Sequence, residues 1–113
     1  MSDQSGISAA FEAFRDHATN HAAAWMSLVR DLGTASALEA KTHQLAYLAV
    51  LAALQRVNGV PFHVAAALET GASRDEIISA ILVGLPAAGH GVTEVLPAAI
   101  AVLDAAPPGS GSE

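Results

Sequence analysis

Large apolar side chains recur along the first third of the chain in steps of three and four residues, the spacing of one helix face. The series consists of Phe11, Phe14, Trp25, Leu28 and Leu32, with Ala18 and His21 at the intervening positions. This pattern predicts one long helix over residues 7–31. Gly33 is expected to end it in the left-handed C-terminal position.

A second apolar series predicts a helix over residues 37–57. It carries Leu45, Leu48, Leu51 and Leu54 and stops before Asn58-Gly59. Ser36 and Glu39 have the spacing of a capping box, in which serine accepts from the helix start and glutamate bonds back to the serine N–H.

Three further helices are predicted after this one. Pro61 suits the first turn of a third helix, which ends at Gly71. Ser73 and Glu76 have capping-box spacing and open a fourth helix that runs toward residue 85. After an interruption at residues 86–91, a fifth helix spans residues 93–104, with Pro97 tolerated in its first turn.

The prediction is therefore an all-α fold, a single small domain of five to six helices over residues 1–105. No segment has the alternation of a strand. Residues 106–113, Ala-Pro-Pro-Gly-Ser-Gly-Ser-Glu, have the composition of a flexible tail.

The composition indicates self-association. Charged residues make up 14% of the 113 residues and hydrophobic residues 52%, whereas about 25% charged residues is usual in soluble domains. A short chain has much surface for its volume and should need more charge, not less. We therefore expect a homo-oligomer that buries apolar surface between subunits.

Charge and cysteine content narrow the possible partners and the location. The net charge is −6 with only five Lys and Arg, which argues against nucleic acid, and no apolar run reaches the ~18 residues of a membrane span. The first four residues, Met-Ser-Asp-Gln, do not begin a signal-peptide pattern. The sequence contains no cysteine, which excludes disulfides and is compatible with the expected cytoplasmic location.

The second and third predicted helices resemble the shared core of the carboxymuconolactone decarboxylase family. The shared features are His63, the pair Ala67-Leu68, Gly71 eight residues after the histidine, and Glu76-Ile77 at the next helix start. They follow a leading helix that begins at residue 38. The resemblance covers about residues 38–103 and implies a fold of the alkylhydroperoxidase D-like type, assembled as a trimer or hexamer.

Two branches of this family differ in chemistry. The alkylhydroperoxidase D-like branch uses cysteines four and seven residues before the histidine and a glutamate on the preceding helix. Gly59, Arg56 and Gln44 hold these positions here, so thiol peroxidase chemistry is excluded. The decarboxylase branch also lacks the cysteines, but it has a glutamate just before the histidine, where residues 57–60 read Val-Asn-Gly-Val. Its Tyr-Ala-Gly-x-Pro segment is replaced by Ala-Ala-Gly-His-Gly at residues 87–91.

His63 is the leading catalytic candidate, with Gln44 as its helper. His63 falls in the first turn of a predicted helix, where N–H groups favour an anion, and a neutral imidazole could serve there as a general base toward an acidic substrate. Gln44 could orient His63 or donate to a substrate carbonyl. The structural alternatives are a histidine hydrogen-bonded within a subunit interface and a buried amide satisfied by backbone.

Arg56 and His90 are candidates for substrate binding. Arg56 could pair with a substrate carboxylate, or it could complement the dipole at a helix end. His90 lies between two glycines. Glycines let the backbone approach a ligand closely, so His90 could line a binding site. The structural alternative is a simple turn.

Other residues receive structural interpretations. His17 and His21 lie four apart on one predicted helix, a spacing that can chelate a metal, but no third ligand is marked, so we expect no metal site. Trp25 and Tyr47 occur at helical spacing with leucines and are interpreted as core or interface residues.

Two functions remain open at this point. The first is a cofactor-free enzyme related to the decarboxylases, a lyase that acts on a small acid, lactone or carbonyl compound by proton transfer at His63. The second is a non-catalytic oligomer that binds a small molecule or an assembly partner. Loss of both cysteines and the glutamate favours the second, whereas retention of the histidine favours the first. A cavity lined by His63 and Gln44 would indicate an enzyme.

Overall fold

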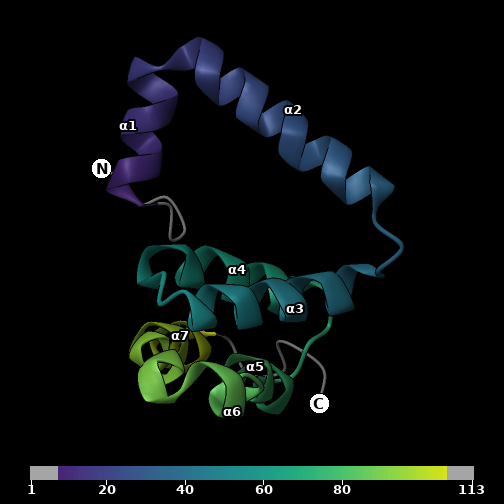
Figure 1. Ribbon diagram of the computed structural model, residues 1–113, viewed down its shortest axis with the longest axis vertical. Coiled ribbons are helices and arrows are strands. Elements are labelled where there is room, and N and C mark those ends of the chain that lie inside the picture. The colour runs from purple at the N-terminus through teal and green to yellow at the C-terminus, as the bar shows by residue number, and fades with distance from the viewer. Residues whose placement is uncertain (1–7, 107–113) are drawn as a thin grey trace.

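The computed structural model describes residues 8–106 and is helical throughout that part of the chain, so the all-α prediction is confirmed (Figure 1). Six α-helices there have at least nine residues: α1 (Ala9–His17), α2 (Thr19–Ala35), α3 (Ala40–Ala53), α4 (Val60–Glu69), α5 (Arg74–Leu82) and α7 (Leu96–Ala105). The shorter elements are α6 (Leu85–Ala88) and the 3₁₀ helices η1 (Val57–Gly59) and η2 (His90–Val95). The predicted tail, beyond Ala106, lies outside the described residues.

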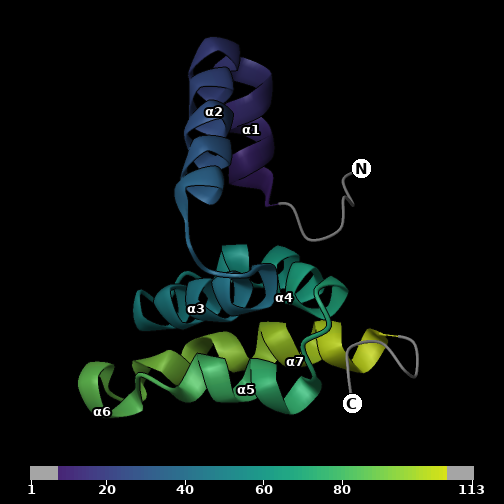
Figure 2. The same ribbon diagram turned by 90° about the vertical axis from the view of Figure 1, so that its right-hand side faces the viewer.

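The helices from α3 onward form a two-layered body, and α1 and α2 form an arm. In Figures 1 and 2, α3 and α4 make one layer, α5, α6 and α7 lie beneath it, and the arm (residues 9–35) stands on the opposite side. The core lies within the body. Its largest fully buried side chains are Leu48, Val60, Val64, Ile77, Ile81, Val92 and Val95.

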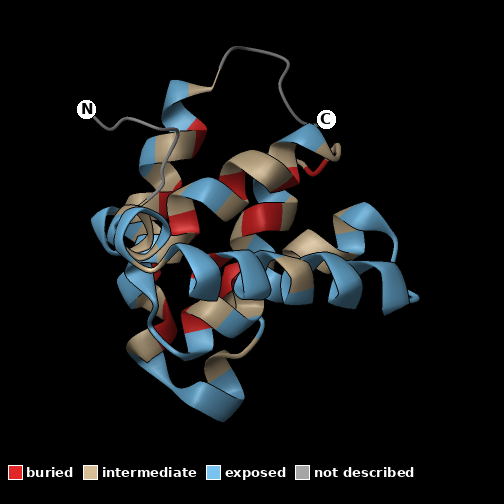
Figure 3. Ribbon diagram, turned by 90° about the horizontal axis from the view of Figure 1, so that it is seen from above, coloured by how far each residue is buried: buried red, intermediate tan, exposed pale blue. Residues whose placement is uncertain are grey.

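The arm contributes no residue to this core cluster in the described chain. Ala22 is its one buried residue there, and α2 is exposed over almost all of its length (Figure 3). No helix among residues 8–106 is both long and apolar enough to cross a membrane.

The prediction of one long helix over residues 7–31 is wrong. Ala18 has φ −134° and ψ 59°, outside the helical region, and separates α1 from α2. The break lets α1 turn back beside α2 (Figure 2), and Phe11 and Phe14 of α1 line a hollow together with Trp25 of α2. Gly33 does not end the helix either, because α2 continues to Ala35.

The predicted capping box at Ser36 and Glu39 is also absent. The Ser36 hydroxyl accepts a hydrogen bond from the N–H of Leu38 at 3.1 Å, and Glu39 is itself the N-cap of α3. The Thr42 hydroxyl donates to the Glu39 carboxylate at 3.2 Å. Helix α3 therefore begins at Ala40 instead of 37, and it ends at Ala53 instead of 57.

Predictions after residue 60 agree better with the structure. Pro61 lies in the first turn of α4, and Gly71 has φ +95°. The capping box at Ser73 and Glu76 is confirmed, with hydrogen bonds of 3.1 and 2.9 Å. However, α5 ends at Leu82, and α7 begins at Leu96 because residues 90–95 form the 3₁₀ helix η2.

Candidate functional site

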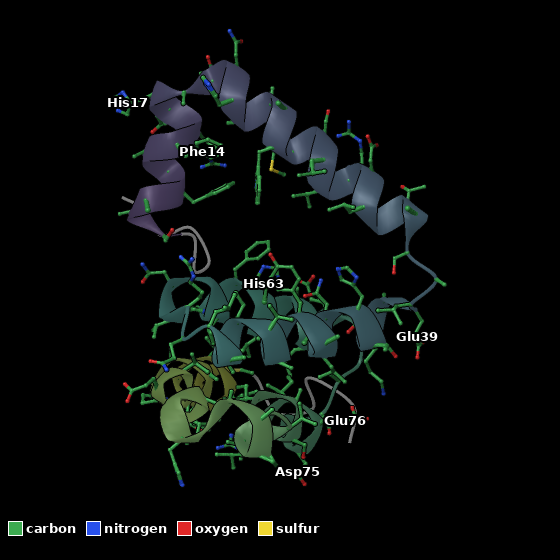
Figure 4. The ribbon with its side chains drawn as sticks, in the orientation of Figure 1. Phe14, His17, Glu39, His63, Asp75 and Glu76 are labelled. Carbon is green, nitrogen blue, oxygen red and sulfur yellow. The ribbon has the colours of Figure 1, made fainter. Side chains whose placement is uncertain are left out.

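His63 lies on the outer side of the α3–α4 layer. Its neighbours along α4 alternate between the core and the surface: Val60 and Val64 are fully buried, whereas Phe62 is exposed and His63 is half-buried. Figure 4 shows the His63 side chain on the side of this layer that faces the arm, while Asp75 and Glu76 lie in the lower layer. The α4 register therefore holds the imidazole at a surface, against the body.

Gln44 on α3 fixes the protonation pattern of the His63 ring. The Nδ1 atom of His63 lies 3.1 Å from the Oε1 atom of Gln44. An amide oxygen only accepts hydrogen bonds, so Nδ1 carries the proton and donates. In the neutral ring the other nitrogen, Nε2, then has a free lone pair, which is what a general base requires. His63 and Gln44 were proposed together from the sequence, and the structure brings their side chains within hydrogen-bonding distance.

Two aromatic rings enclose part of the imidazole. Tyr47 stacks on His63 with centroids 4.2 Å apart and planes 21° apart, and Phe62 meets it edge-on at 5.2 Å. Tyr47 was interpreted as a core or interface residue. Its exposed side chain shows that it is not a core residue, and the interface interpretation stays a prediction. Part of the signal for its proximity to His63 was available, because Gln44 and Tyr47 are three residues apart and share a helix face; the contact itself depends on how α3 packs beside α4.

The surroundings of His63 favour the neutral imidazole. Burial lowers the pKa of His63 below its usual value because the charged form loses hydration, and the nearby His43 lowers it further by charge repulsion. His43 is half-buried one turn before Tyr47, and its ring lies 6.2 Å from the tyrosine ring. Near neutral pH the site therefore holds a base that is ready to accept a proton.

Arg56 and His90 are not joined to this site by any hydrogen bond, ion pair or ring contact within residues 8–106. Arg56 is exposed in the turn between α3 and η1. His90 is exposed at the start of η2, which follows α6 in the lower layer. The space beside its neighbour Gly91 is filled by the amide of Gln55, which lies where a side chain at 91 would point.

The metal spacing considered for His17 and His21 is lost in the structure. His17 is the last residue of α1, and His21 lies in the first turn of α2, so the break at Ala18 separates them. No three His, Asp or Glu side chains within the described residues are grouped as a metal site would require.

Two open hollows formed by the described residues are not lined by His63. One, of about 480 Å³, lies between α3 and α5 and is lined by Thr42, Leu45, Ala46, Ala49, Asp75, Glu76, Ser79, Ala80 and Val83. The other lies inside the arm, where Phe11, Phe14 and Trp25 line it. The His63 side chain instead points toward the side on which the arm stands (Figure 4).

These features define a small all-helical protein that presents a half-buried, neutral histidine held by a glutamine from the preceding helix. The sequence pattern of the carboxymuconolactone decarboxylase family matches residues 19–105, from the start of α2 to the end of α7. The chain therefore belongs to the carboxymuconolactone decarboxylase family. The matched region includes α2, which lies outside the expected core of residues 38–103. No curated protein and no solved structure matches the chain.

Proposed function

We propose that the chain is a cofactor-independent, lyase-type enzyme that acts on a small acid, lactone or carbonyl compound, with His63 as the general base. The observation that carries this proposal is the 3.1 Å contact between His63 Nδ1 and Gln44 Oε1. It holds the imidazole in the tautomer whose Nε2 can accept a proton. The lowered pKa of His63 keeps that nitrogen unprotonated near neutral pH.

The proton transfer has a simple form. Nε2 takes a proton from a carbon beside a substrate carbonyl: the C–H bond breaks, an N–H bond forms, and the electron pair moves onto the carbonyl oxygen. The imidazolium then returns the proton to the substrate. In a decarboxylation, Nε2 first takes the proton of the substrate carboxyl O–H. The C–C bond to the carboxylate then breaks, CO₂ leaves, and its electron pair passes onto the carbonyl oxygen. The imidazolium returns the proton to the carbon left behind, which regenerates the neutral ring.

Gln44 has a second role in this proposal. Its oxygen accepts from His63, so its amide N–H groups remain for a substrate oxygen. A hydrogen bond to the oxygen on which charge develops would stabilise the enolate. Arg56 and His90 remain predictions for substrate binding, and the mechanism above does not depend on them.

The protein is further proposed to be a cytoplasmic homo-oligomer, a trimer or hexamer as the resemblance implies. Its low charged fraction of 14% and its exposed apolar side chains support self-association. The second candidate function, a non-catalytic binder of a small molecule, is favoured by one observation: the two hollows found among the described residues are not lined by His63.

The test uses proton NMR in D₂O with carboxymuconolactone and a panel of small β-keto acids and lactones. Enzyme action appears as loss of substrate or as exchange of a carbon-bound proton for deuterium. His63→Gln should lower the rate by about 10²–10⁴, whereas His43→Gln, a matched change one helix away, should retain most activity. A His63→Gln variant as active as the parent would end the case for His63. Ligand-induced shifts at His63 without turnover would support the binder instead.

A further inference from the structure

The arm presents an apolar face that the rest of residues 8–106 leaves uncovered. The side chains of Trp25, Leu28, Val29 and Leu32 on α2 are all exposed, Leu32 to 59%. Their spacing places them along one side of the helix, and we call them the α2 face. Arg30 hydrogen-bonds Ser27 away from this side, so α2 is amphipathic but lacks a partner for its apolar stripe.

The body presents a second uncovered apolar face beside His63. Its members are Tyr47 and Val50 on α3, Leu54 at the C-cap of α3, and Phe62 on α4, with Leu54 exposed to 60%. We call these four residues the α3–α4 face. Tyr47 and Phe62 also contact the His63 ring, so this face and the candidate site are one surface.

Within residues 8–106 the α2 face and the α3–α4 face do not cover each other. Figures 1 and 2 show the arm standing over the α3–α4 layer, yet the side chains of both faces remain exposed. No hydrogen bond or ion pair joins residues 9–35 to residues 40–105 in the described structure. A two-helix arm without its own core gains most of its stability from packing against something else.

We propose that the arm of a second copy of this chain covers the α3–α4 face and completes the site around His63. Each copy carries both an α2 face and an α3–α4 face. Association of copies therefore covers both faces at once, either by reciprocal exchange between two copies or around a closed ring. A foreign partner would have to bring two complementary faces of its own.

The distribution of charge along the chain and the exposed area of the two faces both support a second copy as the occupant of the α3–α4 face. Copies with a net charge of −6 repel each other, but residues 19–29 and 42–55 contain no Asp, Glu, Lys or Arg. About half of each of the eight face side chains is exposed, which amounts to on the order of 500 Å² per copy. With the flanking alanines, this approaches the ~800 Å² per partner of a standard interface.

If a second copy covers this face, a single copy leaves one side of the His63 imidazole exposed. Gln44 and Tyr47 hold one edge and one face of the imidazole, and the side chain points toward the side on which the arm stands. An apolar α2 face laid over that side would exclude water, which strengthens the polar interactions around a reacting group. The inference thus deepens the proposed function, although its test does not depend on activity.

The first experiment measures assembly by light scattering at micromolar concentration. The parent should have a mass of two or more times 11.4 kDa. Val29→Glu on the α2 face and Val50→Glu on the α3–α4 face should each weaken association at least about tenfold, because a charge would be buried at the contact. Ala23→Glu on the outer side of α2 and Ala101→Glu on α7 add the same charge at exposed positions elsewhere and should assemble like the parent.

The second experiment identifies the occupant by cross-linking. The chain has no cysteine, so single variants Val29→Cys and Val50→Cys, carrying tags of different size, each supply one thiol. Mixed and treated with a short bis-maleimide, they should give a product that contains both tags. Circular dichroism checks that every variant keeps the helicity of the parent.

Each outcome decides the question. A monomeric parent overturns the proposal, as does a Val29→Cys/Val50→Cys double variant that cross-links only within one chain, which would show that the arm closes onto its own body. Assembly that survives both glutamate variants also overturns it. An assembled but inactive parent would keep this inference and remove the proposed enzyme function.

Discussion

The ring of Tyr47 stacks on the imidazole of His63, with centroids 4.2 Å apart and planes 21° apart. Gln44, three residues earlier on α3, holds the edge of the same imidazole through Nδ1. One helix face thus supplies both the group that sets the tautomer of His63 and the ring that sets its orientation. The outcome is a histidine positioned from α3 although it belongs to α4.

Removing the Tyr47 ring should loosen and hydrate His63. Tyr47→Ala is expected to lower the free energy of unfolding by about 0.5–1.5 kcal/mol, the usual contribution of an aromatic pair. It should also raise the pKa of His63 toward its ordinary value, because burial is the main cause of the lowered pKa. Urea denaturation and NMR titration measure the two effects. Tyr47→Phe keeps the ring and should change neither; a pKa unchanged in Tyr47→Ala would contradict this account.

Gln44→Glu should reverse the direction of the His63 pKa shift. A carboxylate at the position of the amide oxygen would still accept from Nδ1 and would stabilise the imidazolium by its charge. The pKa of His63 should therefore rise, which NMR titration of the ring protons would show. Gln44→Leu, which lacks any acceptor, is the control and should not raise it by this route. A Glu variant with the pKa of the parent would mean that residue 44 does not contact His63 in solution.

His63 should make stability fall in mildly acidic solution. Its folded pKa lies below the ordinary value of 6.5, so between the two values the unfolded chain binds more protons than the folded one, and unfolding becomes easier as pH falls. The contribution is fully present above about pH 6.5 and is lost below it. Tm measured from pH 8 to pH 5 should drop more steeply for the parent than for His63→Gln. Parallel curves for the two proteins would count against a neutral, half-buried imidazole.

The chain should have no thiol-dependent peroxidase activity, because the sequence contains no cysteine and the peroxidatic group must be a thiolate. Hydrogen peroxide or an organic hydroperoxide with a dithiol reductant should show only the background rate. Arg56→Cys/Gly59→Cys places a thiol pair at the positions that the family resemblance indicates and tests whether the assay detects such chemistry. Gly59 has φ −85°, so a side chain is tolerated there. Turnover by the parent that survives metal removal would contradict this expectation.

Most of the fold after residue 60 could be predicted because its signals are local. Pro61 in a first turn, Gly71 at positive φ, and the Ser73–Glu76 capping box each act within a few residues. The break at Ala18 could not be predicted in this way, because helical periodicity continues across it. The break is instead accompanied by packing of α1 against α2, which is a tertiary effect.

The site was predictable in part for a similar reason. His63 and Gln44 could be proposed as a pair, since the resemblance placed them at related positions, and the structure does bring them within 3.1 Å. The contact of Tyr47 with His63 was missed because an aromatic at helical spacing was interpreted as a core or interface residue. Its contact with His63 depends on how α3 packs beside α4, which helix periodicity alone does not specify.

Gln55 stores backbone strain that glycine should release. It follows the end of α3 with φ +57°, a left-handed conformation that is costly for residues with a Cβ. Its N–H bonds to the carbonyl of Ala52, and the N–H of Arg56 bonds to that of Leu51, which together form a Schellman motif. Glycine is the preferred residue at this position because it lacks a Cβ.

Gln55→Gly and Gln55→Ala should therefore differ although both remove the amide that lies beside Gly91. The alanine variant keeps the strained conformation, so the glycine variant should be more stable than it by about 1 kcal/mol. Urea denaturation of the two variants measures this difference directly, because the lost side-chain contact is common to both. Equal stabilities would mean that residue 55 is not left-handed in solution and that α3 ends in another way.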